Sequence, residues 1–188
     1  MTGKKRVLVP LATGFEELEA IAAVDLLRRA GAHVVTASVD TPNPVTGRNR
    51  VRVMADIDLP EALEEWGEDW DLVVLPGGPG VDALGKNEAL MGIVGKRIAA
   101  GAPIAAICAA PKLLAQAGLS VTTRVTSYPS TQADLGAYGS YATDTVVVDG
   151  SVVTSRGPGT AVPFALACVE LLFGAARAME IANETVAG

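Results

Sequence analysis

The 188-residue sequence contains one histidine, His33, and only two cysteines, Cys108 and Cys168. A single histidine cannot supply the ligands of a His-based metal site. Because His33 starts a predicted strand that is remote from Cys108, a Cys–His dyad would also lack its base. The cysteines stand far apart, so they form neither a C-x-x-C pair nor a disulfide framework. We therefore expect no metal, and two reduced thiols in a reducing, cytoplasmic compartment.

Basic charge and long apolar runs are also scarce. There are 15 Lys and Arg against 21 Asp and Glu, the net charge is −6, and no basic cluster offers a surface to nucleic acid. No apolar run approaches the length of a membrane span, and no signal-like segment precedes the first predicted strand. With 49% hydrophobic and 19% charged residues, the chain is expected to fold as one domain over residues 1–188, with no membrane partner.

What is present is an alternation of strand-like and helix-like apolar patterns. Strands are predicted at 6–11, 33–39, 72–75, in the run that leads into Cys108, and in a hairpin with arms at 145–148 and 152–155. Helices are predicted at 15–30, 88–100, 111–117, 160–173 and 175–183, the first opened by a capping box at 13–16. Residues 41–50 are expected to form a loop, 51–54 a half-exposed strand or hairpin arm, and 122–140 a polar stretch.

This alternation predicts an α/β fold with a mostly parallel sheet covered by helices on both faces. Such sheets bind ligands beyond the carboxyl ends of their strands, near a topological switch point. Glu19, the pair Gly77-Gly78 and Cys108 each follow the carboxyl end of a different predicted strand. We therefore expect these residues to converge at one edge of the sheet.

Cys108 lies between a buried strand and the start of a helix. A thiol on that sharp turn sits at the positive end of the helix, where unpaired amides favour the thiolate, the reactive form of cysteine. The alternative is a small core residue, because free cysteines are often fully buried. Core packing is the preferred interpretation for Cys168, which lies on an apolar helix face.

Glu19 is the candidate carboxyl partner. Apolar residues one helical turn away suggest a dry setting, and burial would raise its pKa and let it transfer a proton near neutral pH. The alternative is an ordinary solvated helix carboxylate. For Glu16 and Glu17, a role as helix-dipole partners is sufficient.

Gly77 and Gly78 remove side chains where the backbone must approach another group closely. The amides of Gly78 and Ala109 are predicted to form an oxyanion hole, and a plain strand-to-helix turn is the alternative.

Two phosphate-binding motifs are rejected. The segment 80–86 has the glycine–lysine spacing of a phosphate loop, but Asn87 replaces the required Ser or Thr, and Asp82 would repel phosphate. The segment 157–159 lacks the third glycine of a dinucleotide-binding fingerprint.

Five short segments, in order, resemble the ThiJ/PfpI superfamily, and within it the parkinsonism-associated (DJ-one-like) branch of small deglycase/glyoxalase-like proteins. They are GFEELE at 14–19, VDLLRRAG at 24–31, LPGG at 75–78, AAICAAP at 105–111 and TSRGPGT at 154–160. The resemblance covers about residues 5–175. It implies a flavodoxin-like three-layer sandwich and a homodimer with its active sites near the interface, and it implies activity without a cofactor.

The resemblance also implies roles for single residues. It assigns the reactive, oxidation-prone cysteine to Cys108 and its carboxyl partner, taken to be protonated, to Glu19. Supporting or substrate-binding roles are expected for Gly77, Tyr128, Arg28, Arg156 and Pro158.

Some positions depart from the family pattern. Tyr128 stands where animal members have a histidine, and a phenol orients a substrate but is a poor base at neutral pH. Met54 replaces a second oxidisable cysteine, so a redox response must rest on Cys108. Arg48 and Arg50 flank the place where an arginine is expected. Ala109, in place of the histidine of the protease-like branch, argues against peptidase activity.

Three functions follow. The first is a cysteine-dependent glyoxalase and deglycase that converts small 2-oxoaldehydes such as methylglyoxal to hydroxy acids and repairs their glycation adducts. The second is an oxidative-stress sensor, or a redox-regulated chaperone, in which Cys108 is oxidised to a sulfinate held by Glu19. The third is a holdase-like or scaffolding dimer with an incidental cysteine. One activated thiol serves the first two, so we favour them together.

Overall fold

The computed structural model describes residues 4–135 and 140–187, and its centre is a mostly parallel sheet. In the described residues this sheet has seven strands in the order β5-β2-β1-β6-β7-β9-β8, and only the β8–β9 pair is antiparallel. The strands are β1 (Arg6–Leu11), β2 (His33–Ser38), β5 (Ile57–Asp58), β6 (Leu72–Leu75), β7 (Ile104–Ile107), β8 (Val146–Asp149) and β9 (Val152–Ser155). A separate hairpin pairs β3 (Val45–Thr46) with β4 (Arg52–Val53).

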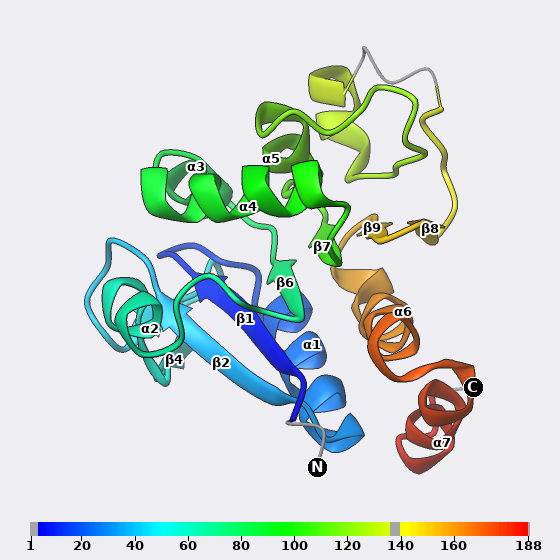
Figure 1. Cartoon of the computed structure of the whole chain (residues 1–188), viewed down its shortest axis with the longest axis horizontal. Coiled ribbons are helices and arrows are strands. Elements are labelled where there is room, and N and C mark those ends of the chain that lie inside the picture. The colour runs from blue at the N-terminus through cyan, green and yellow to red at the C-terminus, as the bar shows by residue number, and fades with distance from the viewer. Residues whose placement is uncertain (1–3, 136–139, 188) are drawn as a thin grey trace.

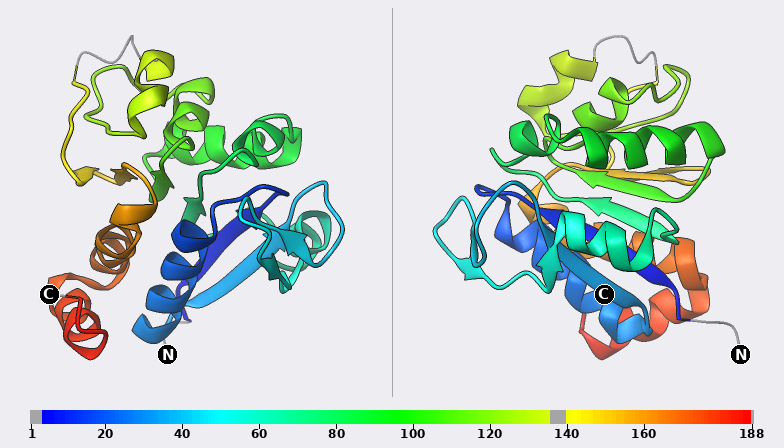
Figure 2. Two further views of the ribbon diagram at one scale, coloured as in Figure 1. Left: turned by 180° about the vertical axis from the view of Figure 1, so that it is seen from behind. Right: turned by 60° about the vertical axis from the view of Figure 1, so that its left-hand side comes forward.

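Helices cover both faces of the sheet, which makes the three layers that the sequence predicts (Figures 1 and 2). One face is covered by α1 (Glu17–Ala30), α6 (Ala161–Phe173) and α7 (Ala175–Glu184). The other face is covered by α2 (Leu59–Trp66), α3 (Val81–Leu84), α4 (Glu88–Ala100) and α5 (Pro111–Gln116). The prediction of an α/β fold with a parallel sheet covered on both faces is confirmed.

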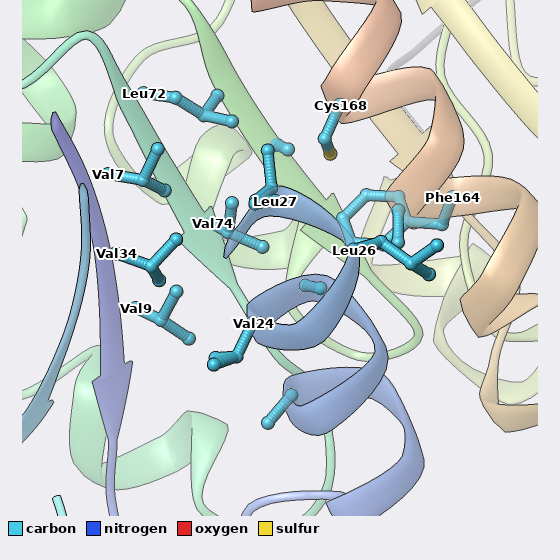
Figure 3. Packing of buried hydrophobic residues seen from close by; sticks show 14 of the residues in the cluster. Val7, Val9, Val24, Leu26, Leu27, Val34, Leu72, Val74, Phe164 and Cys168 are labelled. Atoms are coloured by element: carbon cyan, nitrogen blue, oxygen red, sulfur yellow. The ribbon is translucent and has the colours of Figure 1, made fainter. Parts of the chain in front are cut away.

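Each central strand is buried on both faces, because its side chains alternate between the two helical layers. In β1, Val7 and Val9 pack under α1 and α6, while Leu8 packs under the opposite layer. Figure 3 shows the first of these cores, where Leu27 of α1 lies beside Val74 of β6, and Phe164 of α6 lies beside Leu26 of α1. Cys168 is wholly buried in this core, as the sequence predicts.

The start of α1 differs from the prediction. The helix begins at Glu17, and its N-cap, Glu16, makes no side-chain capping bond. The predicted capping box at 13–16 is therefore wrong. The Thr13 hydroxyl pairs instead with the hydroxyl of Thr41 at 2.5 Å, and the amide of Gly14 donates to the carbonyl of Thr46. Contacts with the distant 41–46 segment outweigh the local capping signal.

The helix α2 was not predicted. Asp58 caps it by accepting a hydrogen bond from the amide of Glu61 at 2.9 Å, and Pro60 occupies its first turn. The signal of an Asp followed by an early proline was therefore present in the sequence. The polar stretch contains the 3-10 helix η1 (Pro129–Leu135), and its residues 136–139 lie outside the described residues.

Among residues 4–135 and 140–187, no helix has both the length and the apolar character needed to cross a membrane.

Candidate active site at Cys108

The topology brings the ends of three neighbouring strands together. From β1 the chain crosses to β2 on one side, whereas from β6 it crosses to β7 on the other, so the switch point lies between β1 and β6. Glu19 follows β1, Gly77 follows β6, and Cys108 follows β7. These residues lie at the same edge of the sheet, as the sequence predicts.

Cys108 is the first residue after β7, and its φ is +65°. A side chain other than glycine rarely adopts this left-handed conformation, so the surrounding structure must hold it. Its amide donates to the carbonyl of Ser155 at 3.0 Å, and its carbonyl accepts from the amide of Tyr128 at 2.8 Å. The sharp turn therefore aims the thiol away from the strand, and the thiol is 6% exposed.

Glu19 points from the first turns of α1 toward this thiol, and its side chain is 0% exposed. Its Oε2 accepts a hydrogen bond from the amide of Gly77 at 2.8 Å, and its carboxyl hydrogen-bonds to Cys108. Its Oε1 has no hydrogen-bond partner within the described part of the chain. The interpretation of Glu19 as a solvated carboxylate is therefore excluded.

Two glycines make this close approach possible. A Cβ built on Gly77 would lie 2.6 Å from both the Cβ of Cys108 and the Oε2 of Glu19, too close for any side chain. Gly78 has a φ of +86°, and a Cβ there would lie 2.8 Å from the amide nitrogen of Glu16. Gly77 is thus required by packing against the carboxyl and thiol, whereas Gly78 is required by its positive φ and by packing against the backbone of residues 14–16.

The carboxyl and the thiol affect each other's ionisation. Burial raises the pKa of Glu19 to about 7, although the amide of Gly77 and the thiol lower it. Burial, followed by the charge on Glu19, raises the pKa of the Cys108 thiol to about 12. The amides of Gly78 and Ala109 hydrogen-bond to the sulfur and lower that pKa.

The amides at the turn favour the thiolate, in the direction that the sequence predicts, but they do not offset burial. The following helix, α5, is only 6 residues long, less than two turns, and burial outweighs the amides. While Glu19 is charged, the thiol therefore keeps its proton. The pair needs a proton transfer, or a protonated Glu19, to place the negative charge on sulfur.

The sulfur opens into a cavity of about 350 Å³. Of the residues predicted for the site, Gly78, Cys108, Ala109, Tyr128 and Pro158 line it. The lining also contains residues that sequence reasoning did not assign, namely Arg48, Pro79, Asp82, Lys112, Ser130 and Thr131. Apart from Arg48, which lies next to the position where the resemblance expects an arginine, no sequence signal marks them, because they come from the β3–β4 hairpin, the segment from Pro79 into α3, α5 and η1, which converge only in the folded chain.

Two predicted arginines lie elsewhere. Arg28 donates to the carbonyl of Val34 at 3.0 Å and to Asp56 at 2.7 Å, beside the β2 edge of the sheet. Arg156 donates to the carbonyl of Thr143 at 2.8 Å. Neither lines the Cys108 cavity. In the described residues, no group of three or more His, Cys, Asp or Glu side chains is arranged to hold a metal ion.

Fold and site together define a class of protein: a flavodoxin-like α/β sandwich that holds a cysteine on a strand-to-helix turn against a buried carboxyl. The sequence pattern of the DJ-1/PfpI family matches residues 5–171, and the chain belongs to that family.

Known proteins are similar to this chain in sequence, and a solved structure is similar in fold. Protein dj-1beta of Drosophila melanogaster is 42% identical over 181 residues, which are 95% of each chain. The crystal structure of Drosophila melanogaster DJ-1beta has a TM-score of 0.90, with 98% of both chains covered at 40% identity. The glutathione-independent glyoxalase DJR-1.2 of Caenorhabditis elegans is 35% identical over 85% of this chain and 83% of its own. Protein DJ-1 homolog B of Arabidopsis thaliana is 38% identical over 98% of this chain, which spans 42% of that relative.

Proposed function

We propose that the protein is a glyoxalase and deglycase that uses Cys108 as its nucleophile and needs neither glutathione nor a cofactor. The observation that carries this proposal is the fully buried Glu19 carboxyl hydrogen-bonded to a thiol that opens into a cavity. The Caenorhabditis elegans relative, named a glutathione-independent glyoxalase, supports the reaction class.

The first step joins the thiol to the substrate. The carboxylate of Glu19 takes the proton of Cys108, and the sulfur attacks the aldehyde carbon of a 2-oxoaldehyde. An S–C bond forms, and the carbonyl electron pair moves onto oxygen. The amides of Gly78 and Ala109, which lie against the sulfur, are placed to donate to this oxyanion. The oxyanion then takes the proton from Glu19, which gives a neutral hemithioacetal.

The second step is an internal oxidation and reduction, so no external oxidant is needed. Glu19, again a carboxylate, removes the proton from the carbon bound to sulfur and returns it to the neighbouring carbon through an enediol, while the hydroxyl proton of the hemithioacetal passes to the former ketone oxygen. The product is a thioester of the 2-hydroxy acid, in which the former aldehyde carbon is oxidised and the ketone carbon reduced. Water hydrolyses the thioester and restores the thiol. A pKa of about 7 suits Glu19 to both directions of proton transfer near neutral pH.

The test is turnover of methylglyoxal to lactate by the pure protein without glutathione. Wild type is expected to produce lactate, and Cys108→Ser and Glu19→Gln are expected to fall to the background rate. Cys168→Ser is the matched control, because Cys168 is wholly buried and far from any carboxyl partner, so this variant keeps its activity. Lactate production that survives Cys108→Ser rejects the proposal.

The deglycase activity follows from the same chemistry. An early adduct of methylglyoxal with an amine or thiol is in equilibrium with free methylglyoxal, whose aldehyde carbon Cys108 attacks. We therefore expect the same two variants to lose adduct repair and glyoxalase activity together.

A second candidate, oxidation sensing, is favoured by the donors around the sulfur. The amides of Gly78 and Ala109 and the carboxyl of Glu19 surround Cys108 with groups that hydrogen-bond oxygen atoms added to sulfur. Under graded peroxide, mass spectrometry is expected to show oxygen on Cys108 before Cys168. Equal oxidation of the two thiols contradicts this proposal.

We also propose that two copies of the chain associate through the exposed apolar side chains near the start of α1. Leu18 is 61% exposed on this helix, and Met54 is 68% exposed beside β4. Glu17 hydrogen-bonds to Asn49, which places the β3–β4 hairpin beside α1. Sedimentation of Leu18→Asp is expected to show a monomer where wild type is a dimer, with Val148→Asp, an exposed valine on β8, as the control. Two free, buried thiols fit a reducing, cytoplasmic location.

A further inference from the structure

The cavity at Cys108 is lined by two cations, and only one of them is neutralised by a neighbour. The Nζ of Lys112 lies 2.6 Å from the Oδ1 of Asp82, which lines the same cavity. The guanidinium of Arg48 makes no hydrogen bond or ion pair with any residue that the structure describes. Its charge still acts on the site, since it lowers the pKa of both Glu16 and Glu19.

The backbone that carries Arg48 is held in place by a buried carboxylate. The Oε1 of Glu17 accepts hydrogen bonds from the amides of Asn49 at 2.7 Å and Val51 at 3.3 Å, and its Oε2 accepts from the side-chain amide of Asn49 at 3.1 Å. The amide of Arg48 donates to the carbonyl of Phe15 at 2.9 Å. These bonds on both sides of Arg48 fix the start of its side chain relative to α1.

The sequence does not assign this role to Glu17, which was expected to be only a helix-dipole partner. Glu17 is 8% exposed, and the amides of Asn49 and Val51 keep its pKa below the usual value although burial opposes them. It is therefore a carboxylate at neutral pH, committed to the 49–51 backbone. A dipole partner on the helix surface would need no such set of donors.

Resting on the proposed function, we infer that the cavity takes aldehydes that also carry an anionic oxygen group, a carboxylate or a phosphate, which Arg48 binds and for which Glu17 positions Arg48. A guanidinium matches either group with two parallel hydrogen bonds. At about 350 Å³ the cavity also has room for a group beyond the two reacting carbons.

The inference is tested by alkylation of Cys108 rather than by turnover. Iodoacetate and iodoacetamide have nearly the same size, and each forms an S–C bond to the thiolate with loss of iodide, but only iodoacetate carries a carboxylate. The ratio of their rate constants at Cys108 therefore reports attraction of an anion to the cavity. Changes in thiol ionisation affect both reagents alike and cancel in the ratio.

Arg48→Gln is expected to lower the iodoacetate to iodoacetamide ratio by about fivefold at low salt, and 1 M salt is expected to remove most of the difference from wild type. Arg48→Lys, which keeps the charge, is expected to retain most of the ratio. Arg50→Gln is the matched control, because Arg50 is exposed on the same hairpin and does not line the cavity. An equal ratio in Arg48→Gln and Arg50→Gln overturns the inference.

Glu17→Gln tests the positioning role. It replaces one of the two acceptor oxygens with an NH2 group, which must face either the backbone amides of Asn49 and Val51 or the side-chain amide of Asn49, so the ratio is expected to fall toward that of Arg48→Gln. The iodoacetamide rate is expected to stay near wild type, which a general loss of structure would not allow. An unchanged ratio in a folded Glu17→Gln variant removes Glu17 from the inference.

Added acetate and inorganic phosphate separate the two anionic groups. The anion that binds at Arg48 is expected to slow the alkylation of Cys108 by iodoacetate in wild type and not in Arg48→Gln. If neither anion slows this reaction in wild type, the inference is contradicted. Absence of lactate formation from methylglyoxal would count against the proposed function, but the alkylation ratio can still be measured. Failure of the proposed function and failure of the anion-binding inference are therefore distinguishable.

Discussion

At the scale of single residues, the site depends on one carboxyl that is removed completely from water. Burying a charged carboxylate is costly, so Glu19 holds a proton in the folded state at a pH where it is ionised in the unfolded chain. Its one backbone partner, the amide of Gly77, offsets only part of that cost. The buried position of Glu19 beside the Cys108 turn therefore keeps its pKa near 7.

Replacing Glu19 is expected to change how stability depends on pH. The folded-state pKa of about 7 lies above the model-peptide value of 4.5, so between these values the folded state binds more protons than the unfolded state. The contribution of Glu19 to stability is fully present below pH 4.5 and is lost as the pH rises to 7, a change of about 3 kcal/mol. Urea unfolding of wild type and Glu19→Gln between pH 4.5 and 8 measures it.

The free energy of unfolding of Glu19→Gln relative to wild type is expected to increase across this pH range. Carboxyls that do not interact with Glu19 are present in both proteins and cancel in the comparison, whereas the charge on Glu16 raises the pKa of Glu19 and is part of the measured effect. A constant difference from pH 4.5 to 8 would show that Glu19 titrates normally.

Gly77→Ala is expected to abolish activity and lower stability by about 1–3 kcal/mol. Its methyl group would lie 2.6 Å from the Cβ of Cys108 and from the Oε2 of Glu19, so the reacting pair must separate. Lactate formation and thermal unfolding measure the two effects. Gly92→Ala in α4, where a Cβ meets nothing within 4 Å, is the control and is expected to retain full activity.

At the scale of elements, the edge strand β2 is protected by a pair of side chains. The short β5 covers only Ala37 and Ser38, which leaves the first part of β2 without a neighbouring strand. Asp56 accepts from the amide of Thr36 at 2.8 Å, and Arg28 donates to the carbonyl of Val34 at 3.0 Å. The pair thus satisfies backbone groups that would otherwise be open to another strand.

Arg28→Ala is expected to reduce stability by about 1 kcal/mol and to increase aggregation at high protein concentration. The Arg28–Asp56 ion pair itself contributes little, because both side chains are half exposed, so the effect comes from the freed strand edge. Light scattering and chemical unfolding measure it. The rate of Cys108 alkylation is expected to stay at the wild-type value, and a large change in that rate would return Arg28 to the site.

At the scale of the whole molecule, one sheet joins two hydrophobic cores. Phe164 of α6 lies in the core beneath α1, and Leu90 of α4 lies in the opposite core. Strands such as β6 contribute Leu72 and Val74 to the first and Val73 to the second. Loss of packing in either core therefore weakens the sheet, and with it the strand β7 that orients Cys108. That residues 1–188 form a single domain stays a prediction.

Phe164→Ala is expected to cost about 3–5 kcal/mol, because it leaves a cavity among fully buried side chains. Val162→Ala on the same helix, where the valine is exposed, is expected to cost less than 1 kcal/mol. Thermal unfolding followed by tryptophan fluorescence monitors Trp66 and Trp70 on the opposite face. If Phe164→Ala leaves the unfolding temperature that tryptophan fluorescence reports unchanged, the two cores do not unfold cooperatively.

Strong local patterns in the sequence predicted most of the fold. The apolar runs at β1, β6 and β7 and the periodicity of α1 and α4 fix these elements, because each pattern matches the period of one structure. The capping box at 13–16 failed because contacts with residues 41–46 prevailed. The helix α2 was missed because its signal, an Asp cap with an early proline, is short and carries little periodicity.

The sequence by itself determined the α/β class, the turn at Cys108 and the convergence of Glu19, Gly77 and Cys108, because parallel strands all end at one edge of the sheet. Only the tertiary structure decided the depth of burial of Glu19, and with it both pKa values, because desolvation depends on every group packed around a charge. It also replaced Arg28 with Arg48 at the cavity, since the side chains that line a cavity come from segments that meet only after folding.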